Sequence, residues 1–213
     1  DLALRLLDEG QTDSYELAQL LDDSREGRGD LLLDIPFDPP EVWAAGVTYK
    51  SSEMERRRES ETPDVYSRVY SAERPELFFK ATTDRCVGPF EAVGTRTDSE
   101  WNVPEPELAF VLYKGHIIGY TIGNDVSSRT IEGENPLYLP QAKIYDQSCA
   151  IGPCLATPEA LGDPHNLTIR CSVVRGVDVV FTGHASTSQM ARRCEELADW
   201  LQRHNTIPNM TAV

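Results

Sequence analysis

The sequence predicts a mostly β fold with some helix, of the α+β class. Two apolar runs, 108–113 and 116–122, are separated by Lys114-Gly115, which is typical of antiparallel strands joined by a tight turn. A second pair of β-rich runs, 167–174 and 177–181, flanks Gly176 in the same way. Helical periodicity is confined to the beginning of the chain, to a charged stretch at 51–61 and to the end. Strands should therefore form most of the core.

Composition excludes several classes of protein. The 213 residues are enough to bury a core, and a formal net charge of −15 argues against nucleic acid as a partner, because phosphate contacts need Lys and Arg. The sequence contains no apolar run of the length that a membrane span requires. Five cysteines without a CxxC pair indicate free thiols in a cytoplasmic protein. Among them Cys149 is a candidate nucleophile, although a buried inert thiol is commoner.

A cluster of prolines at 36, 39 and 40 divides the chain into two parts. Residues 1–23 indicate one or two short helices with a cap at Asp13-Ser14, and 22–30 form a polar connector. A short apolar run, 31–35, is closed by prolines at 36, 39 and 40. We expect a small N-terminal α/β piece over 1–40 and a catalytic domain over 41–213.

The catalytic domain should open with a buried strand at 41–47 and a charged helix at 51–61. A short strand at 77–79 then delivers Lys80, either as a snorkelling surface lysine or as a cation near an anionic site. Residues 91–101 form a loop or an edge strand, and 126–139 should wrap over the site. Near the end, Ser186 is expected to cap a helix. Its apolar face comprises Met190, Cys194, Leu197, Ala198 and Leu201.

Three carboxylates lie at the open end of the first predicted hairpin. Glu105 and Glu107 share one face of a strand, about 6.6 Å apart. A two-residue turn at Lys114-Gly115 would aim Asp125 at the other face, whereas a three-residue turn at 114–116 with a glycine bulge sets Asp125 opposite Glu105. We favour the second register, which gathers all three acids.

Such a cluster needs a cation, because like charges on an apolar strand repel one another. Mg²⁺ takes carboxylate oxygens and keeps positions open for substrate, and Mn²⁺ or Ca²⁺ could substitute. In the alternative interpretation the two glutamates cap an exposed strand end and Asp125 begins a helical turn. None of the four histidines has a second histidine at ligand spacing, so we assign no metal role to them.

Four motifs resemble one family. ELFFKAT, PEPELAFVL, GYTIGND and QAKIYDQSCAIGP, in this order, are similar to the fumarylacetoacetate hydrolase superfamily. The resemblance extends from about residue 42 to the C-terminus. The longer strings WNVPEPELA, GNDVSSRTIEGENPLYLPQAK and STSQM resemble its 2-keto-3-deoxy-D-arabinonate dehydratase branch. The resemblance implies a mixed β-roll or sandwich, whose C-terminal end we expect to be incomplete here.

The resemblance also implies a site. It places the family's E-x-E, aspartate and lysine on Glu105, Glu107, Asp125 and Lys143, the last of which we place on a strand over 139–146. Metal would bind the three acids. Lys143 is the candidate catalytic residue, and Lys143, Thr48 and Lys80 are the candidate substrate-binding residues. Glu132, Glu134, Asn135 and Tyr138 are further candidates for contacting a polyol, and Glu132 or ordered water for taking a proton.

Hydrolytic branches of the family carry a histidine and, three residues later, a glutamate on a lid. Here Ser52 and Glu55 take these places, which argues against carbon–carbon bond hydrolysis by that route. The expected activity is therefore Mg²⁺-dependent dehydration of a 2-keto-3-deoxy sugar acid to a semialdehyde such as 2,5-dioxopentanoate. Acylpyruvate hydrolysis, oxaloacetate decarboxylation and a catalytically silent metal-binding relative are the alternatives. The family further implies a homodimer or homotetramer.

Overall fold

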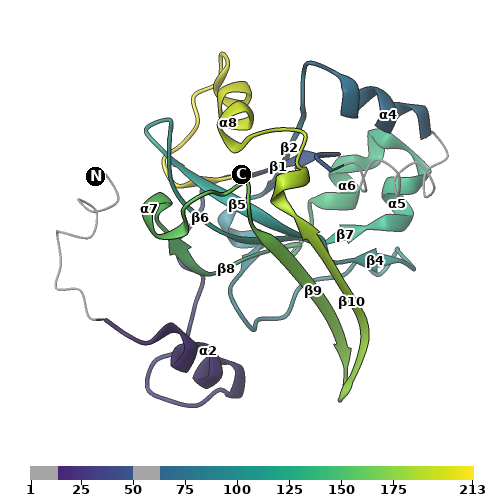
Figure 1. The fold of residues 1–213 in the computed structure, drawn as a ribbon. Coiled ribbons are helices and arrows are strands. Elements are labelled where there is room, and N and C mark those ends of the chain that lie inside the picture. The colour runs from purple at the N-terminus through teal and green to yellow at the C-terminus, as the bar shows by residue number, and fades with distance from the viewer. Residues whose placement is uncertain (1–13, 50–62) are drawn as a thin grey trace.

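A seven-stranded mixed sheet forms the body of the molecule (Figure 1). The computed structural model describes residues 14–49 and 63–213. Of the neighbouring pairs in this sheet, β1–β11 and β3–β8 are parallel, and the others are antiparallel. The strand order is β2 (Glu76–Ala81), β1 (Val42–Gly46), β11 (Thr211–Ala212), β5 (Pro106–Tyr113), β6 (His116–Asp125), β8 (Cys149–Ala156) and β3 (Cys86–Val87). The predicted α+β architecture, rich in strands, is confirmed.

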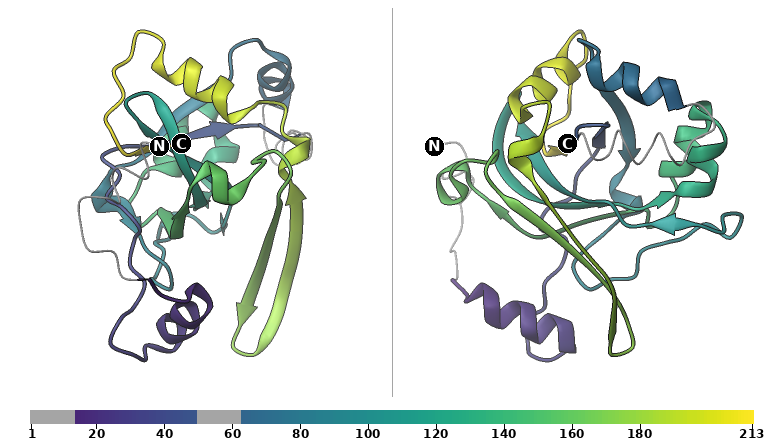
Figure 2. Two further views of the ribbon diagram at one scale, coloured as in Figure 1. Left: turned by 60° about the vertical axis from the view of Figure 1, so that its left-hand side comes forward. Right: turned by 45° about the vertical axis from the view of Figure 1, so that its right-hand side comes forward.

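The larger of two core clusters among the described residues lies between this sheet and the C-terminal helix. Figure 2 shows the sheet curling, with helix α8 (Cys194–Gln202) against one of its faces. The predicted apolar face of that helix is confirmed, since Cys194, Leu197, Ala198 and Leu201 pack on Phe110, Leu112 and Tyr120 of the sheet. The predicted start of the helix is wrong.

Tertiary pairing explains where α8 begins. Ser186 caps only a 3₁₀ turn, η3 (Thr187–Gln189). Met190 then forms a bridge with Tyr49, and the amide of Ala191 donates to the carbonyl of Thr48 at 2.8 Å. This extended segment separates the turn from α8, because pairing with a distant strand end overrides local helix propensity.

The hairpin β5–β6 has the predicted register for a different reason. Its turn has only two residues, Lys114 and Gly115, with φ angles of 50° and 79° that suit a type I′ turn, so the predicted three-residue turn is wrong. The extra residue is Ile118, which lies between the pairs Leu112↔Ile117 and Val111↔Gly119. This bulge restores the register in which the amide of Asp125 donates to the carbonyl of Glu105 at 3.0 Å.

The N-terminal part contains helix α2 (Leu17–Glu26), which runs into the predicted connector and ends at Gly27 in the left-handed conformation. The apolar run at 31–35 forms no strand, so within residues 14–40 this piece is helix and coil. The predicted helix before residue 14 lies outside the described residues, and of its predicted cap only Ser14 is described. The predicted helix at 51–61, which contains Ser52 and Glu55, also lies outside them. Helix α4 (Pro63–Ser71) follows the second of these gaps, and we did not predict it.

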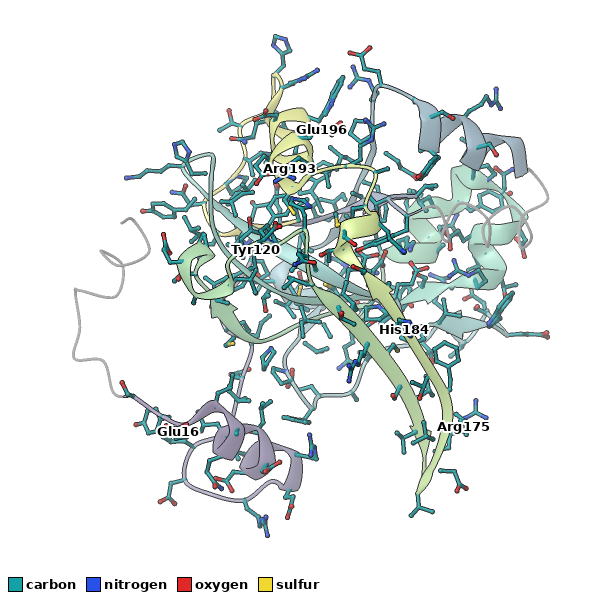
Figure 3. All side chains as sticks on the ribbon, viewed as in Figure 1. Glu16, Tyr120, Arg175, His184, Arg193 and Glu196 are labelled. Carbon is teal, nitrogen blue, oxygen red and sulfur yellow. The ribbon has the colours of Figure 1, made fainter. Side chains whose placement is uncertain are left out.

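The second predicted hairpin is confirmed as β9 (Thr168–Arg175) and β10 (Asp178–Ser186). It projects from the body as a long arm, with Arg175 towards its tip and His184 nearer the sheet (Figure 3). The predicted strands at 41–47 and 77–79 are confirmed as β1 and β2, and 91–101 is a loop. All five cysteines are free thiols, as predicted.

The remaining elements are short, and most of them contact one another beside the end of β6. They are η1 (Thr83–Arg85), β4 (Asn102–Val103), β7 (Ser127–Ser128), α5 (Arg129–Glu134), η2 (Pro136–Tyr138), α6 (Leu139–Lys143) and, farther away, α7 (Pro158–Leu161). Residues 126–139 therefore wrap back over the end of the hairpin, as the sequence indicated.

Candidate active site

Three carboxylates converge where β5 begins and β6 ends. Each of Glu105, Glu107 and Asp125 offers an oxygen within 4.8 Å of those of the other two. Glu107 stands opposite Gly123, and Asp125 is almost fully buried. Among the described residues this is the one group of three or more His, Cys, Asp or Glu side chains with metal-binding spacing. The acidic cluster predicted from strand alternation is therefore present.

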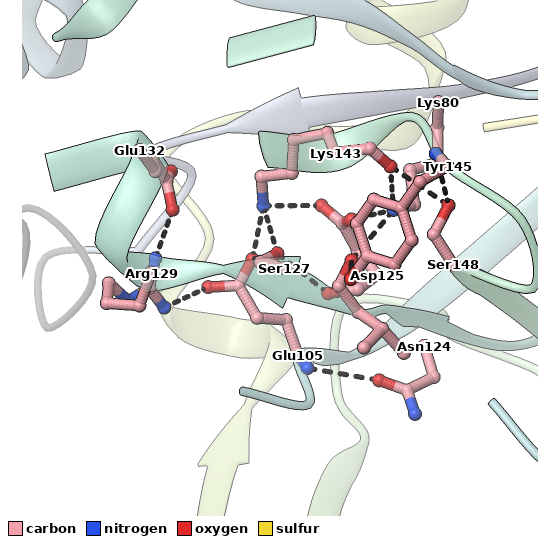
Figure 4. Close-up of polar contacts among 11 residues, drawn as sticks. Lys80, Glu105, Asn124, Asp125, Ser127, Arg129, Glu132, Lys143, Tyr145 and Ser148 are labelled. Carbon is pink, nitrogen blue, oxygen red and sulfur yellow. Dashed lines mark hydrogen bonds and ion pairs between the residues drawn. The ribbon is translucent and has the colours of Figure 1, made fainter. Parts of the chain in front are cut away.

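Lys143 reaches this cluster from a helix. Its ammonium lies 2.5 Å from Glu105 Oε2, 2.7 Å from Asp125 Oδ2 and 2.7 Å from Ser127 Oγ (Figure 4). The predicted strand at 139–146 is wrong, because Lys143 is the last residue of α6. Pro140 lies in the first turn of that helix. Backbone N–H groups there have no partner within the helix, so the missing N–H of proline costs nothing, and its fixed φ favours the helix.

Arg129 is a cation that sequence analysis missed. Its guanidinium lies 2.7 Å from Glu105 Oε1 and also pairs with Glu132, which is three residues further along α5. The side chain of Ser128 caps this helix by accepting from the amide of Ile131. The available signal was an arginine four residues after Asp125, in the segment expected to cover the site. Arg129 therefore holds one oxygen of a proposed metal ligand.

Lys80 lies behind Asp125. Only 1% of Lys80 is exposed, and its ammonium is 2.7 Å from Asp125 Oδ1. It also donates to the backbone carbonyls of Val126 and Lys143. The interpretation of Lys80 as a snorkelling surface lysine is wrong.

A cavity of about 820 Å³ opens onto the carboxylates. Thr48 and Tyr49 line it beside Glu107, and Glu132 lines it beside Lys143, whereas Lys80 is not among its lining residues in the part of the chain that the structure describes. Burial, together with the negative charge of Glu107, raises the pKa of Tyr49 to about 12. The phenol therefore stays protonated and can donate a hydrogen bond into the cavity.

The donor chemistry fits a hard divalent cation. All three converging groups are carboxylates, which Mg²⁺ and Ca²⁺ prefer, and no thiol or imidazole shares their cluster among the described residues. The cluster also faces a cavity, so a substrate could complete the coordination of a bound ion. Cys149, the candidate nucleophile, is buried and does not line that cavity. Its hydrogen bond with Cys86, together with burial, raises the pKa of its thiol.

A family model described as fumarylacetoacetate (FAA) hydrolase C-terminal matches residues 41–211. The chain belongs to this family. The chain is similar to a probable 2-keto-3-deoxyxylonate dehydratase of Haloferax volcanii, to which it is 56% identical over 179 residues that are 84% of this chain. A 2-dehydro-3-deoxy-D-arabinonate dehydratase of Saccharolobus solfataricus is 49% identical over 85% of this chain. The chain spans 62% and 63% of the lengths of these two relatives.

A solved structure confirms the family fold. It is described as 2-keto-3-deoxy-D-arabinonate dehydratase complexed with magnesium and 2,5-dioxopentanoate, and it is 41% identical to this chain. The match has a TM-score of 0.85 and covers 99% of this chain and 74% of that one. The resemblance and the mixed β-roll predicted from it are thus confirmed.

Proposed function

We propose that this chain carries the active site of a Mg²⁺-dependent dehydratase for a 2-keto-3-deoxy sugar acid. The product would be a semialdehyde such as 2,5-dioxopentanoate. The observation that carries the proposal is the convergence of Glu105, Glu107 and Asp125 with the ammonium of Lys143 at the wall of one cavity. The names of the relatives support the substrate class, and the magnesium complex supports the choice of metal.

Formal charges support a divalent cation and an anionic substrate. The described members of the network carry one more negative than positive charge. Its acids are Glu105, Glu107, Asp125 and Glu132, and its cations are Lys80, Arg129 and Lys143. A divalent cation and the carboxylate of a 2-oxo acid together bring one positive charge. These described residues, the metal and the substrate would together be formally neutral, which suits a partly buried site.

When bound, Mg²⁺ would stabilise the negative charge that develops on the keto oxygen as C3 loses a proton. Glu105, Glu107 and Asp125 are the residues that would hold it. Lys143 contacts Glu105 and Asp125, two of the residues that would hold that ion, and all three residues line the cavity. From there it can orient the substrate carboxylate or assist proton transfer.

Other cavity residues would bind the sugar part of the substrate. We propose Thr48 as a hydroxyl partner and Tyr49, protonated at neutral pH, as a donor. Glu132 lines the cavity and is held by Arg129, which places a carboxylate within the site for proton transfer or for binding the polyol. Lys80 is left out of this set, since it does not line the cavity among the described residues.

The test is a coupled assay on purified protein with Mg²⁺. Epimers of 2-keto-3-deoxypentonate are supplied, and the semialdehyde is followed with an aldehyde dehydrogenase. Dehydration of one epimer that EDTA abolishes and Mg²⁺ restores is the expected result. Turnover of acetylpyruvate or oxaloacetate alone would contradict the dehydratase, while absence of turnover with metal still bound would indicate a catalytically silent relative.

Three expectations stay predictions. They are the boundary between a piece at 1–40 and a domain at 41–213, a homodimeric or homotetrameric assembly, and a cytoplasmic location. The structure adds one observation here: within the described parts of the chain, helices are too short or too polar to cross a bilayer.

A further inference from the structure

Lys80 is a fully buried cation that the proposed chemistry does not use. It sits on β2, and its side chain enters the protein behind the acidic cluster. Burying an ammonium is costly unless it is paired and fully hydrogen-bonded. The Lys80 ammonium forms an ion pair with Asp125 Oδ1 at 2.7 Å, and it donates hydrogen bonds to the carbonyls of Val126 at 3.0 Å and Lys143 at 2.5 Å. The ammonium is therefore paired and hydrogen-bonded within the protein.

The three groups that contact this ammonium belong to the two segments that build the site. Val126 follows Asp125 at the end of β6, and Lys143 ends α6. One ammonium thus binds the side chain of a proposed metal ligand, the backbone next to that ligand and the backbone of the proposed catalytic lysine. The last carbonyls of a helix carry partial negative charge, so a cation there is also favourable.

Second donors reinforce both carbonyls. The hydroxyl of Tyr145 donates to the carbonyl of Val126 at 3.1 Å, and the hydroxyl of Ser148 donates to the carbonyl of Lys143 at 3.0 Å (Figure 4). The amide of Val126 in turn donates to the carbonyl of Ser148 at 3.0 Å. Lys80 is thus the charged centre of a connected polar layer beneath the site.

The carboxylate of Asp125 lies between two ammonium groups, those of Lys80 and Lys143. Lys80 forms an ion pair with Asp125 Oδ1 and Lys143 donates to Oδ2, so each oxygen of this carboxylate faces one ammonium. A group held in this way needs no reorganisation during reaction, and a misplacement of about 1 Å can cost on the order of 100-fold in rate.

We infer that Lys80 is a positioning residue, which sets Asp125 and Lys143 relative to each other without touching the substrate. This inference rests on the proposed function for its kinetic part only. Removing the ammonium while keeping the side-chain bulk should loosen the link between β6 and α6. The three carboxylates would remain, so metal binding should largely persist while turnover falls.

The decisive variant is Lys80→Met, compared with Lys114→Met at the exposed tip of the β5–β6 hairpin. Both proteins are assayed at saturating Mg²⁺, at a temperature where circular dichroism shows them folded. For Lys80→Met we expect kcat to fall on the order of 100-fold, KM for the sugar acid to change less than about threefold, and the Mg²⁺ Kd from calorimetry to stay within about tenfold. Lys114→Met should match the parent protein in all three.

Two milder variants test the same layer if Lys80→Met does not fold. Tyr145→Phe and Ser148→Ala each remove one second donor and leave the ammonium in place. Each should lower kcat roughly 3- to 10-fold without a matching change in KM, as expected for one neutral hydrogen bond. Parent-level kcat in both variants would overturn the inference, as would parent-level kcat in folded Lys80→Met.

Metal spectroscopy separates this inference from the proposed function. If the parent protein turns over no 2-oxo acid, Mn²⁺ bound at the cluster reports the geometry directly through its paramagnetic resonance spectrum. Lys80→Met should then show a broadened spectrum relative to the parent and to Lys114→Met, because Asp125 has lost one of its two ammonium partners. An unchanged spectrum would overturn the positioning role, whatever the activity of the chain.

Discussion

Single side chains give this site its charge and its shape. Glu105 and Glu107 owe their common direction to the two-residue period of a strand, which local sequence sets. Asp125 joins them through backbone pairing with Glu105 at 3.0 Å. Arg129 and Lys143 then each take one oxygen of Glu105, so its carboxylate is oriented from both sides.

Glu107 offers the most direct test of the acidic cluster. Glu107→Ala removes one of three converging carboxylates, so Mg²⁺ binding should weaken by more than about 100-fold and turnover should be lost with it. Calorimetry and the coupled assay measure the two effects. Glu159→Ala, which removes an exposed carboxylate on α7, is the control and should behave as the parent protein. Full turnover in Glu107→Ala would exclude the cluster as the metal site.

At the scale of elements, the site depends on how short segments are joined. The bulge at Ile118 brings Asp125 onto the same face as the glutamates although the turn has only two residues. Three residues after Asp125, Ser128 ends β7 and caps α5, so that Arg129 begins the helix and pairs with Glu105. One bulge therefore brings the three acids together, and one helix cap places Arg129 beside them.

The cap of α5 can be tested against a cap of the same kind elsewhere. Ser128→Ala removes the acceptor for the amide of Ile131 and should lower the free energy of unfolding by about 1–2 kcal/mol. Because Arg129 is the next residue and pairs with Glu105, a proposed metal ligand, Mg²⁺ affinity should also fall, by roughly 3- to 10-fold. Denaturant titration and calorimetry measure these changes.

Thr157→Ala is the matched control for that experiment. Thr157 caps α7 by accepting from the amide of Ala160, and it does not line the cavity. Its loss should cost a comparable free energy of unfolding without changing Mg²⁺ affinity. Equal effects of the two variants on metal binding would show that α5 does not position Arg129.

At the scale of the whole molecule, the sheet joins segments from both ends of the described chain. Strand β11, near residue 211, lies between β1 and β5 and binds both. The amide and carbonyl of Val213 also exchange hydrogen bonds with Phe110, each at 2.9 Å. The β1–β2 pair, which carries Lys80, is thereby fixed to the hairpin that carries the carboxylates.

Buried tyrosines link global stability to alkaline pH. Burial raises the pKa of Tyr120 to about 12, from an ordinary value of about 10. The folded state therefore favours the protonated phenol. This contribution to stability is fully present below pH 10, declines between pH 10 and 12, and is lost as pH rises through about 12.

Unfolding titrations at pH 8, 10, 11 and 12 measure this dependence. Tyr120→Phe cannot ionise in the core, so its stability should fall less between pH 10 and 12 than that of the parent protein. Tyr138→Phe, which changes an exposed tyrosine, is the control and should retain the steeper decline. Identical slopes for Tyr120→Phe and the parent protein would contradict the assignment.

Sequence alone determined the features that depend on near neighbours in the chain. Both long hairpins, the apolar face of α8 and the clustering of two glutamates follow from periods of 2.0 and 3.6 residues, which side-chain direction enforces locally. Four motifs in order also identified the family, and its fold follows from that. The register of Asp125 was predicted correctly, although its cause was placed in the turn instead of the strand.

Only the tertiary structure decided how the cations are arranged around the acids. Lys80 and Lys143 are 63 residues apart in the chain, and nothing local predicts that one binds the carbonyl of the other. Contacts between distant segments likewise produce three other features. They are helix α6, which ends at Lys143, the extended segment before α8, and the pairing of Arg129 with Glu105. A buried charge is tolerated only when folding supplies its partners, so such roles become visible only in three dimensions.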